Sequence, residues 1–321
     1  MAAAMEILLA KRKSRVLVPS KLPCMAGMPT INLTAGCGHR CLYCYARGYR
    51  CYPGPGRVVV YADVLEKLRG ELDRRRRQPL AISFSPSSDL FQPVPEVLDL
   101  AYDVLKLVLG RGIGVVVLTK GRIPKRHREL LAAHAPLVRL EIGLITTEPR
   151  LARLVEPGAA SPKIRLRQMR EFLAQGVATR ARVDPILPGV TDDPDALHAL
   201  CAALAGAGVR ELSASTLLLR PAILAGLRSG LGGSRRLRRL LAAFRQAKRM
   251  MLPAGQAQAL ALPAARRRRI FDWLTAIAAQ YSIAVHVCGC KNPDLAAGSC
   301  NFAAHWTPPS AAKRQLALFA T

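Results

Sequence analysis

Three closely spaced cysteines constrain this chain more than any other feature of its sequence. Cys37, Cys41 and Cys44 follow the spacing C-x3-C-x2-C. A zinc site or an ordinary cluster with four thiolates needs its fourth ligand close by or in a matching pair further along the chain. Three thiolates on their own therefore predict an iron–sulfur cluster with one iron left open for another ligand.

The alternative is a structural zinc site whose fourth ligand comes from elsewhere in the chain. Cys24, Cys51 and His39 are candidates for that ligand. Most of the nine cysteines gather in two places, which is not the pattern of a secreted disulfide scaffold. We therefore expect metal or cluster ligation in a reducing cytoplasm.

The charge balance predicts a polyanionic partner. Lysine and arginine number 48 against 21 acidic residues, which gives a net charge of +27. Nucleic acid is the first expectation and an acidic membrane surface the second. Arginine runs at Arg74–Arg77, Arg235–Arg239 and Arg266–Arg269 suit phosphate contacts, although such runs are also typical of solvated faces. Because aromatic residues make up only 5% of the chain, a flipped base is favoured over an open stacking platform.

The apolar segments do not predict a membrane span or a secretion signal. The run at Met1–Ala10 has no basic residue ahead of it. The longest apolar region, Val94–Leu118, is interrupted by charged residues. We expect a soluble, cytoplasmic protein, with nucleic acid rather than a membrane as its partner.

Strand-like and helix-like segments alternate through the first two thirds of the chain, which predicts an α/β fold. The expected strands are short apolar or β-branched runs at Thr30–Leu33, Leu80–Ser85, Gly114–Lys120, Val138–Leu144, Ala178–Asp184 and Glu211–Leu218. The expected helices between them are Ala62–Arg75, Glu96–Gly110, Lys125–Ala133, Lys163–Gln175 and Asp193–Ala207. Six such units predict a parallel partial (β/α)6 barrel or open sheet, with the site at the carboxyl ends of its strands.

The pattern changes beyond residue 220, so we expect three parts. They are a basic leader (1–27), the (β/α)6 core (28–220) and a basic helical C-terminal extension with a cysteine-bearing tail (221–321). Within the extension the sequence predicts a short segment at Ile223–Gly230, helices at Ser234–Leu252 and Arg266–Gln280, and a strand at Ser282–Val287.

The cysteine loop resembles the motif of the radical S-adenosylmethionine (SAM) enzymes. In that family three cysteines hold a [4Fe-4S] cluster, and its fourth iron binds the amino and carboxylate groups of SAM. The resemblance implies that Cys37, Cys41 and Cys44 hold the cluster. It also implies reductive cleavage of SAM to a 5′-deoxyadenosyl radical that abstracts hydrogen from a substrate, with electrons from a donor such as flavodoxin or ferredoxin.

Residues 28–220 resemble the spore photoproduct lyase-like branch of this superfamily. The segment Cys41–Ala46 carries two tyrosines, as in this branch, and the resemblance implies that Tyr43 and Tyr45 are catalytic. Tyr43 also matches the aromatic position that packs near the adenine in radical SAM enzymes. The alternative for Tyr43 is a role in packing alone. The segments Ser87–Asp89 and Leu118–Gly121 follow successive strands in the order of the branch. The resemblance therefore implies SAM-binding roles for Ser88, Asp89 and Lys120.

Charged residues at later strand ends extend this expected SAM site. A ribose is bound by a carboxylate or hydroxyl, and the SAM carboxylate by arginine or lysine. Glu141 is placed in the cofactor site on this basis, with Arg182 and Arg220 as candidates for the carboxylate. The alternative for Arg182 is an internal ion pair with Glu141 or Asp184.

One position departs from the branch. The photoproduct lyase has a cysteine just before its Thr-Ser-Asp stretch that returns a hydrogen atom to the product. Here Pro86 stands at that position. Repair of a thymine dimer by that route is therefore not expected, and the sequence favours a different lesion, base or substrate.

A second cysteine group lies near the C-terminus, with the spacing C-x-C-x9-C at Cys288, Cys290 and Cys300. It resembles the ligands of an auxiliary iron–sulfur cluster, in a glycine- and proline-containing loop. A zinc site and redox-active or incidental thiols are the alternatives. Candidates for a fourth ligand are Cys24, Cys51, His286, His305 or a non-protein group.

The sequence as a whole predicts a radical SAM enzyme that acts on nucleic acid, preferably DNA, in repair or modification. A second hypothesis keeps the enzyme class and changes the substrate to RNA or a peptide. A third is a zinc-stabilised nucleic-acid-binding protein without catalysis.

Overall fold

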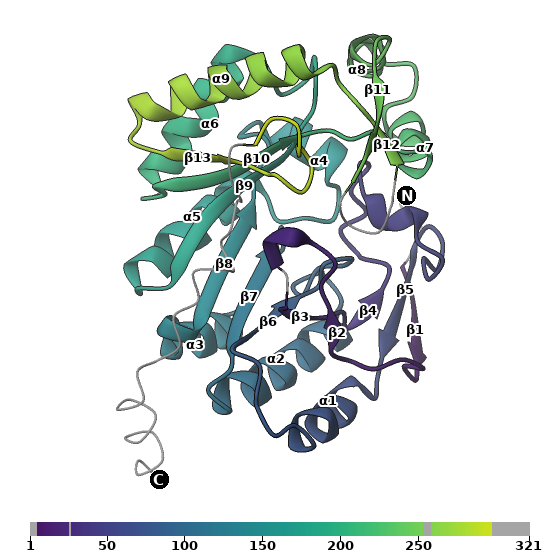
Figure 1. The fold of residues 1–321 in the computed structure, drawn as a ribbon, viewed down its shortest axis with the longest axis vertical. Helices are drawn as coiled ribbons and strands as arrows, with labels where there is room; N and C mark the ends of the chain where they lie inside the picture. Colours follow the sequence, from purple (N-terminus) through teal and green to yellow (C-terminus); the bar gives the residue numbers. More distant parts are fainter. Residues whose placement is uncertain (1–4, 26, 253–257, 297–321) are drawn as a thin grey trace.

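A largely parallel sheet forms the centre of the protein. The computed structural model describes residues 5–25, 27–252 and 258–296. The main sheet has the strand order β13-β10-β9-β8-β7-β6-β3-β2, in which all neighbours are parallel except the β2–β3 pair at one edge (Figure 1). Its strands are β2 (Val18–Pro19), β3 (Pro29–Ile31), β6 (Ala81–Phe84), β7 (Gly114–Thr119), β8 (Val138–Gly143), β9 (Ala178–Ile186), β10 (Glu211–Thr216) and β13 (Ala284–Val287).

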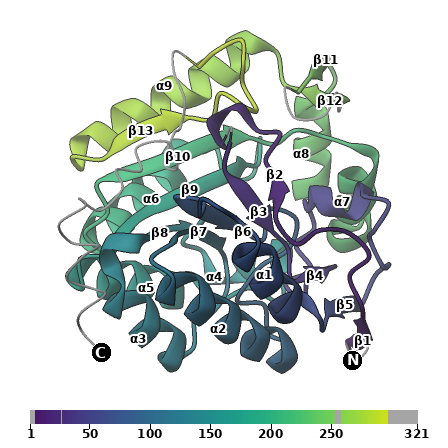
Figure 2. The ribbon, with the colours of Figure 1, turned by 60° about the horizontal axis from the view of Figure 1, so that its bottom comes forward.

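Amphipathic helices connect the parallel strands. Figures 1 and 2 show α1, α2, α3 and α5 in a row along the main sheet. The helices are α1 (Val64–Asp73), α2 (Pro95–Gly110), α3 (Lys125–Ala133), α4 (Pro149–Val155), α5 (Pro162–Ala174), α6 (Pro194–Gly206), α7 (Pro221–Leu231), α8 (Arg235–Ala243) and α9 (Ala264–Gln280). In α2, proline at the first turn favours helix initiation, and the buried stripe recurs every three or four residues at Val97, Ala101, Val104 and Val108.

The central strands are buried on both faces, but only one face is apolar throughout, because the other face of β8, β9 and β10 carries polar residues such as Glu141, Arg182 and Ser213. Val115 and Val117 of β7 and Leu140 and Ile142 of β8 are fully buried. Short apolar or β-branched runs, continuous in β7 and alternating with polar residues in β8, explain why these strands could be located from the sequence. The prediction of an α/β fold with a partial barrel of parallel strands is confirmed.

A small sheet beside the core was not predicted. Its strand order is β1-β5-β4, with β1 (Glu6–Ala10), β5 (Arg57–Tyr61) and β4 (Thr34–Ala35). β1 pairs with β5 in parallel and β4 pairs with β5 antiparallel. Because β4 ends just before Cys37, this sheet fixes the start of the cysteine loop.

The predicted basic helix at Ser234–Leu252 is wrong in its second half. The helix α8 ends at Ala243, and β11 (Lys248–Met251) pairs antiparallel with β12 (Gln258–Ala261). In β12 buried and exposed residues alternate, as in a half-buried strand. Leu252, Ala259 and Ala261 pack on Leu218, so burial of this patch outweighs the helical propensity of the basic run.

Beyond residue 220 the sheet gains a seventh parallel strand. β13 lies along β10 in parallel, which confirms the strand predicted at Ser282–Val287 and extends the parallel sheet past the six predicted strands. Its carboxyl end carries Cys288 to the same edge of the sheet as the other strand ends. No helix within the described residues is long and apolar enough to cross a membrane.

Candidate active site

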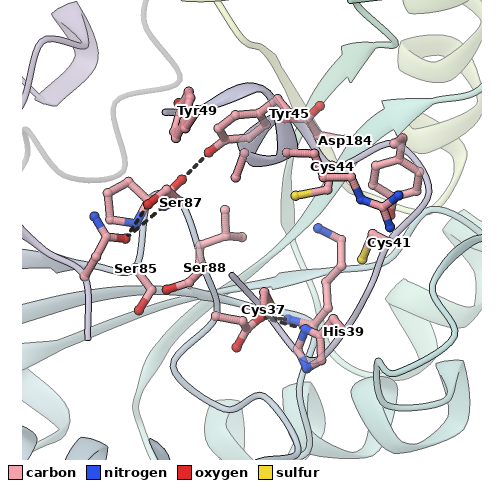
Figure 3. A pocket seen from close by; sticks show the side chains of 18 of the residues that line it. Cys37, His39, Cys41, Cys44, Tyr45, Tyr49, Ser85, Ser87, Ser88 and Asp184 are labelled. Atoms are coloured by element: carbon pink, nitrogen blue, oxygen red, sulfur yellow. Dashed lines mark hydrogen bonds and ion pairs between the residues drawn. The ribbon is translucent and has the colours of Figure 1, made fainter. Parts of the chain in front are cut away.

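One large cavity lies at the carboxyl ends of the parallel strands. It has a volume of about 750 Å³ and is lined by loops that follow β4, β6, β7, β9, β10 and β13. Cys37, Cys41 and Cys44 all line it, and Figure 3 shows their side chains around the same space as Ser85 and Ser88. All three predicted cluster ligands therefore line a cavity at the strand ends, the edge at which the sequence predicted the site and at which parallel α/β sheets build their sites.

The cysteine loop is held by backbone contacts to distant segments. The Gly38 amide donates to the Gln92 side chain at 2.7 Å. The Leu42 amide donates to the Val155 carbonyl at 2.9 Å, and the Gly158 amide donates to the His39 carbonyl at 2.9 Å. The loop therefore has a defined shape even though it carries almost no regular secondary structure.

A buried charge network lies below the loop. The Tyr43 hydroxyl donates to Glu156, and Glu156 forms an ion pair with Arg165 in which both side chains are 1% exposed. Burial raises the pKa of Tyr43 well above its ordinary value, and the Glu156 carboxylate adds to the rise. Burial alone would raise the pKa of Glu156 too, but Arg165 and Lys120 hold it below its ordinary value. Tyr43 is therefore fixed as a neutral hydrogen-bond donor.

Lys120 lies over the Tyr43 ring, with its ammonium nitrogen 5.8 Å from the ring centroid. Burial alone would lower the pKa of Lys120, but the charges of Cys41, Glu156 and Asp184 raise it above its ordinary value. Lys120 thus presents a cation to the cavity that the three cysteines line. A positive charge in that position suits a carboxylate ligand.

Asp89 joins the strand-end loops to one another. It accepts hydrogen bonds from the Thr119 hydroxyl at 2.7 Å and the Lys120 amide at 2.8 Å, and its carboxylate lies 3.3 Å from His39 Nδ1. Burial would raise the pKa of Asp89, but His39 and these hydrogen bonds lower it below its ordinary value. Asp89 therefore has a positioning role in the structure, and its predicted contact with SAM stays a prediction.

Several buried polar atoms around the cavity have no partner among the described residues. They are His39 Nε2, Ser85 Oγ and Ser88 Oγ. Buried polar atoms are nearly always hydrogen-bonded, so unpaired ones at a cavity wall indicate a ligand. Ser88 was predicted from the sequence to bind SAM, whereas His39 was considered only as a zinc ligand and Ser85 was not singled out.

Two residues at the cavity adopt left-handed backbone conformations. Arg40 and Ser85 both have φ of 53° and neither is glycine. Residues other than glycine adopt this region at an energetic cost and are concentrated at functional sites. Both lie in segments that line the cavity, one in the cysteine loop and one after β6.

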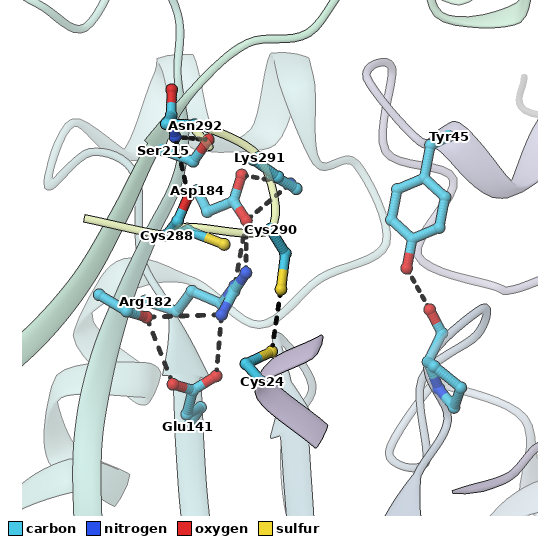
Figure 4. Close-up of polar contacts among 12 residues, drawn as sticks. Cys24, Tyr45, Glu141, Arg182, Asp184, Ser215, Cys288, Cys290, Lys291 and Asn292 are labelled. Carbon is cyan, nitrogen blue, oxygen red and sulfur yellow. Dashed lines mark hydrogen bonds and ion pairs between the residues drawn. The ribbon is translucent and has the colours of Figure 1, made fainter. Parts of the chain in front are cut away.

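Glu141 and Arg182 line the cavity, but their charges are paired with protein groups. Arg182 lies 3.1 Å from Glu141 and 2.8 Å from Asp184 (Figure 4). Arg180 also pairs with Glu141 at 2.6 Å. The predicted alternative of an internal ion pair therefore describes Arg182. The predicted contacts of Glu141 and Arg182 with SAM remain predictions.

Tyr45 and Arg220 also line the cavity, as the sequence predicted for residues of the site. The Tyr45 hydroxyl donates to the backbone carbonyl of Pro86, so the cysteine loop touches the segment in which the branch has its thiol. Arg220 is the residue before α7. These positions do not test the predicted catalytic role of Tyr45 or the predicted cofactor-binding role of Arg220.

The second cysteine group enters the same cavity. Cys288 and Cys290 follow β13, line the cavity and are buried. Cys300 lies outside the described residues. Cys24, which the sequence named only as a candidate fourth ligand, approaches Cys290 with 3.2 Å between the two sulfur atoms (Figure 4).

The three loop cysteines are free thiols, the donors that an iron–sulfur cluster needs. Among the described residues no group of three or more His, Cys, Asp or Glu side chains is set around a point that one metal ion could occupy. A tetrahedral zinc site would hold each thiolate about 2.3 Å from the ion. Three thiols that line one cavity, together with a partly buried lysine and unpaired polar atoms, match the donor set of a thiolate-bound cluster with a polar ligand at its side.

Comparison with known proteins agrees with this geometry. The family model of the radical SAM superfamily matches residues 31–201. An uncharacterised protein of Mycobacterium tuberculosis is 30% identical over 213 residues, which are 63% of this chain and 63% of that protein, so this chain matches less than two thirds of the relative's length. The radical SAM Nα-GlyT isomerase of Pseudomonas phage M6 is 27% identical over 163 residues, which are 50% of this chain and 34% of the phage protein.

The fold also matches a solved structure. Spore photoproduct lyase complexed with dinucleoside spore photoproduct superimposes with a TM-score of 0.65 over 88% of this chain and 81% of that chain. The sequence identity is 16%, so the likeness concerns the fold.

Proposed function

This chain belongs to the radical SAM superfamily, and we propose that it abstracts hydrogen from a nucleic-acid substrate with a [4Fe-4S] cluster and SAM bound in the cavity. The observation that carries the proposal is the meeting of three thiols, the partly buried ammonium group of Lys120 and unpaired polar atoms in one cavity. When bound, the cluster and SAM supply a carbon-centred radical that can take hydrogen from an unactivated carbon.

The residues of the chain would bind and orient these groups. Cys37, Cys41 and Cys44 would hold the cluster, and Lys120 would neutralise the carboxylate of SAM. Ser88 and His39 have unpaired polar atoms that would accept or donate hydrogen bonds to SAM or substrate. The buried pair of Glu156 and Arg165 would keep Tyr43, and with it the loop, at a fixed distance from the strand ends.

Charge around the cavity supports a polyanionic substrate. Eight lysine and arginine side chains line it against three acidic ones, and all three acidic side chains already contact basic side chains of the chain. The helix α8 exposes four arginines, while Leu237 and Leu240 face the core. Arg239 packs against Gly189, which follows β9, so this helix lies at the cavity end of the sheet.

The names of two similar proteins are compatible with this proposal. The solved photoproduct lyase binds a dinucleoside, and the phage relative is named as an isomerase of the same superfamily. We propose DNA as the preferred substrate and modification or repair as the outcome. Pro86 leaves no thiol after β6, so reversal of the thymine lesion by a donor at that position is not proposed.

Electrons would come from a small donor protein such as flavodoxin or ferredoxin. Thiolate ligation also needs reducing conditions, so the cytoplasm remains the predicted location.

The chemistry is tested by anaerobic incubation of the reconstituted protein with dithionite, SAM and either native or UV-treated DNA. We expect 5′-deoxyadenosine together with an altered nucleoside. RNA and a peptide mixture serve as parallel arms, because a product from one of those and none from DNA would overturn the DNA assignment while keeping the enzyme class. Zinc without iron or sulfide after anaerobic purification, and no SAM cleavage, would instead support a non-catalytic binding protein.

The basic surface is tested by the salt dependence of DNA binding. The variant Arg235→Gln/Arg238→Gln/Arg239→Gln removes charge at the cavity end, and we expect the slope of log K against log salt to fall by about one per arginine. The matched control Arg74→Gln/Arg75→Gln/Arg76→Gln removes the same charge just before β6, at the amino ends of the strands. Equal losses in the two variants would contradict a binding face at the cavity.

A further inference from the structure

Three cysteines from opposite ends of the chain meet at the wall of the cavity, away from the cysteine loop. Cys24 and Cys290 are 266 positions apart in the sequence, yet their sulfur atoms lie 3.2 Å from each other. Cys288 is buried in the same small cluster, which Leu22 closes on one side. All three cysteines line the cavity that also receives Cys37, Cys41 and Cys44.

The segment that carries Cys288 and Cys290 is fixed to the sheet. The Cys288 amide donates to the Ala214 carbonyl at 2.9 Å, which continues the pairing of β13 with β10. The chain then turns, and the Asn292 amide returns to the Cys288 carbonyl at 2.9 Å. The turn places the two cysteines on one side, toward Cys24 (Figure 4).

Side chains beyond the two cysteines secure this turn. The Lys291 ammonium lies 2.7 Å from both carboxylate oxygens of Asp184. Asn292 is completely buried, and its amide group donates to Ser215 Oγ at 3.2 Å. Arg267 donates to Asn292 at 3.1 Å and to Asp294 at 2.9 Å. These hydrogen bonds and ion pairs fix the turn and therefore the positions of its two cysteines.

Cys24 is presented from a turn of its own. It lies in the short 3-10 helix Pro23–Met25, where the Met25 amide donates to the Leu22 carbonyl at 2.9 Å. The Met28 amide then donates to the Met25 carbonyl at 3.0 Å. The N-terminal segment thus has an ordered structure at the point where it reaches the cavity.

We propose that Cys24, Cys288 and Cys290 bind a second thiophilic metal centre, a zinc ion or an iron–sulfur cluster, whose remaining coordination position faces the cavity. Three thiolates on one wall form a soft donor set that favours these metals over magnesium or calcium. The site differs from the sequence-based expectation because Cys24 replaces Cys300 as the third protein ligand. The proposed metal site does not depend on the radical chemistry. Contact between its open coordination position and a substrate, in contrast, rests on the proposed function.

Binding requires small movements of the thiols. The described side chains are not already set around one ion, and the contact between Cys24 and Cys290 is shorter than the separation of about 3.8 Å between two thiolates on a tetrahedral zinc. Side-chain rotation within the fixed turns can open this contact, and metal binding would release the thiol protons.

The test is metal analysis of the full chain in a background that lacks the first cluster. In the variant Cys37→Ala/Cys41→Ala/Cys44→Ala, purified and reconstituted anaerobically with either zinc or iron and sulfide, we expect about one zinc, or about four iron and four sulfide, per chain. Adding Cys24→Ala or Cys290→Ala should remove most of that metal. Cys201→Ala is the matched control, because Cys201 is buried in α6 away from the cavity, and it should leave the metal content unchanged.

Each alternative gives a distinct outcome. A background variant that binds neither metal would overturn the site, whether or not the wild-type protein cleaves SAM. A mass decrease of about two hydrogens that Cys290→Ala abolishes, with no metal bound, would show a disulfide in its place. If Cys300→Ala lost the metal, Cys300 would be a fourth protein ligand. The proposed open coordination position would then be wrong. Circular dichroism of each variant, compared with the background, separates loss of ligand from loss of fold.

Discussion

The two thiol sites of this protein are built in opposite ways. In the first, three cysteines lie within eight consecutive residues, and distant segments fix the loop from outside. In the second, Cys24 and Cys290 come from the two ends of the chain, and the fold itself brings them together. The first site can be recognised from spacing alone, whereas the second exists only if β13 joins the sheet.

This difference predicts different sensitivities. The cysteine loop depends on buried groups below it, namely Glu156, Arg165 and the closely packed Gly158. The second site depends on the position of the turn after β13, which Arg267 and Lys291 hold through hydrogen bonds to acidic side chains. A mutation can therefore impair one site and leave the other intact. Variants that affect only one of the two sites test this difference.

The largest effect is expected below the cysteine loop. Arg165→Met leaves Glu156 buried without its cation, and we expect a loss of about 3–5 kcal/mol in the free energy of unfolding, measured with urea. Arg167→Met on the same helix is the control, because that arginine is half exposed and its pair with Glu171 should contribute less than about 1 kcal/mol. Similar losses in the two variants would contradict the role assigned to the buried pair.

An intermediate effect is expected at Gly158. A side chain there would place its Cβ 2.2 Å from the Gly38 carbonyl oxygen, inside the cysteine loop. Gly158→Ala should cost about 1–3 kcal/mol and lower the iron bound at the first site, while the second site keeps its metal. Gly206→Ala meets nothing within 4 Å and should leave both metal contents unchanged. Full occupancy of the first site in Gly158→Ala would show that the loop tolerates a shift.

An effect of similar size, but on the second site, is expected for Arg267, whose side chain is 3% exposed. Arg267→Met removes hydrogen bonds to Asn292 and Asp294, and we expect a loss of about 1–3 kcal/mol together with weaker metal retention at the second site. SAM cleavage by the first site should persist. The exposed neighbour Arg268 serves as control, since Arg268→Met should stay within about 0.5 kcal/mol of wild type. A loss of SAM cleavage in Arg267→Met as large as in the loop variants would remove the distinction between the sites.

The sequence predicted those parts of the structure that depend on local patterns. Short apolar or β-branched runs located the six predicted parallel strands, and cysteine spacing predicted the first site, whose three cysteines all line the cavity. The strand β11 was mistaken for helix because its basic residues carry no signal of the patch on Leu218 that decides its conformation. The Tyr43–Glu156 contact spans 113 positions and the Cys24–Cys290 contact 266, and no local pattern specifies such contacts. Pairing of Arg182 with Glu141 and Asp184 was foreseen only as one of two alternatives.

The most direct test of the central claim compares reductive SAM cleavage in three proteins. Wild type, Cys41→Ala and Cys290→Ala are incubated anaerobically with dithionite and SAM, and 5′-deoxyadenosine is quantified. We predict that wild type and Cys290→Ala form it and that Cys41→Ala does not, because the cluster that binds SAM is proposed to be held by the cysteine loop. Formation of 5′-deoxyadenosine by Cys41→Ala at the wild-type rate would contradict the account.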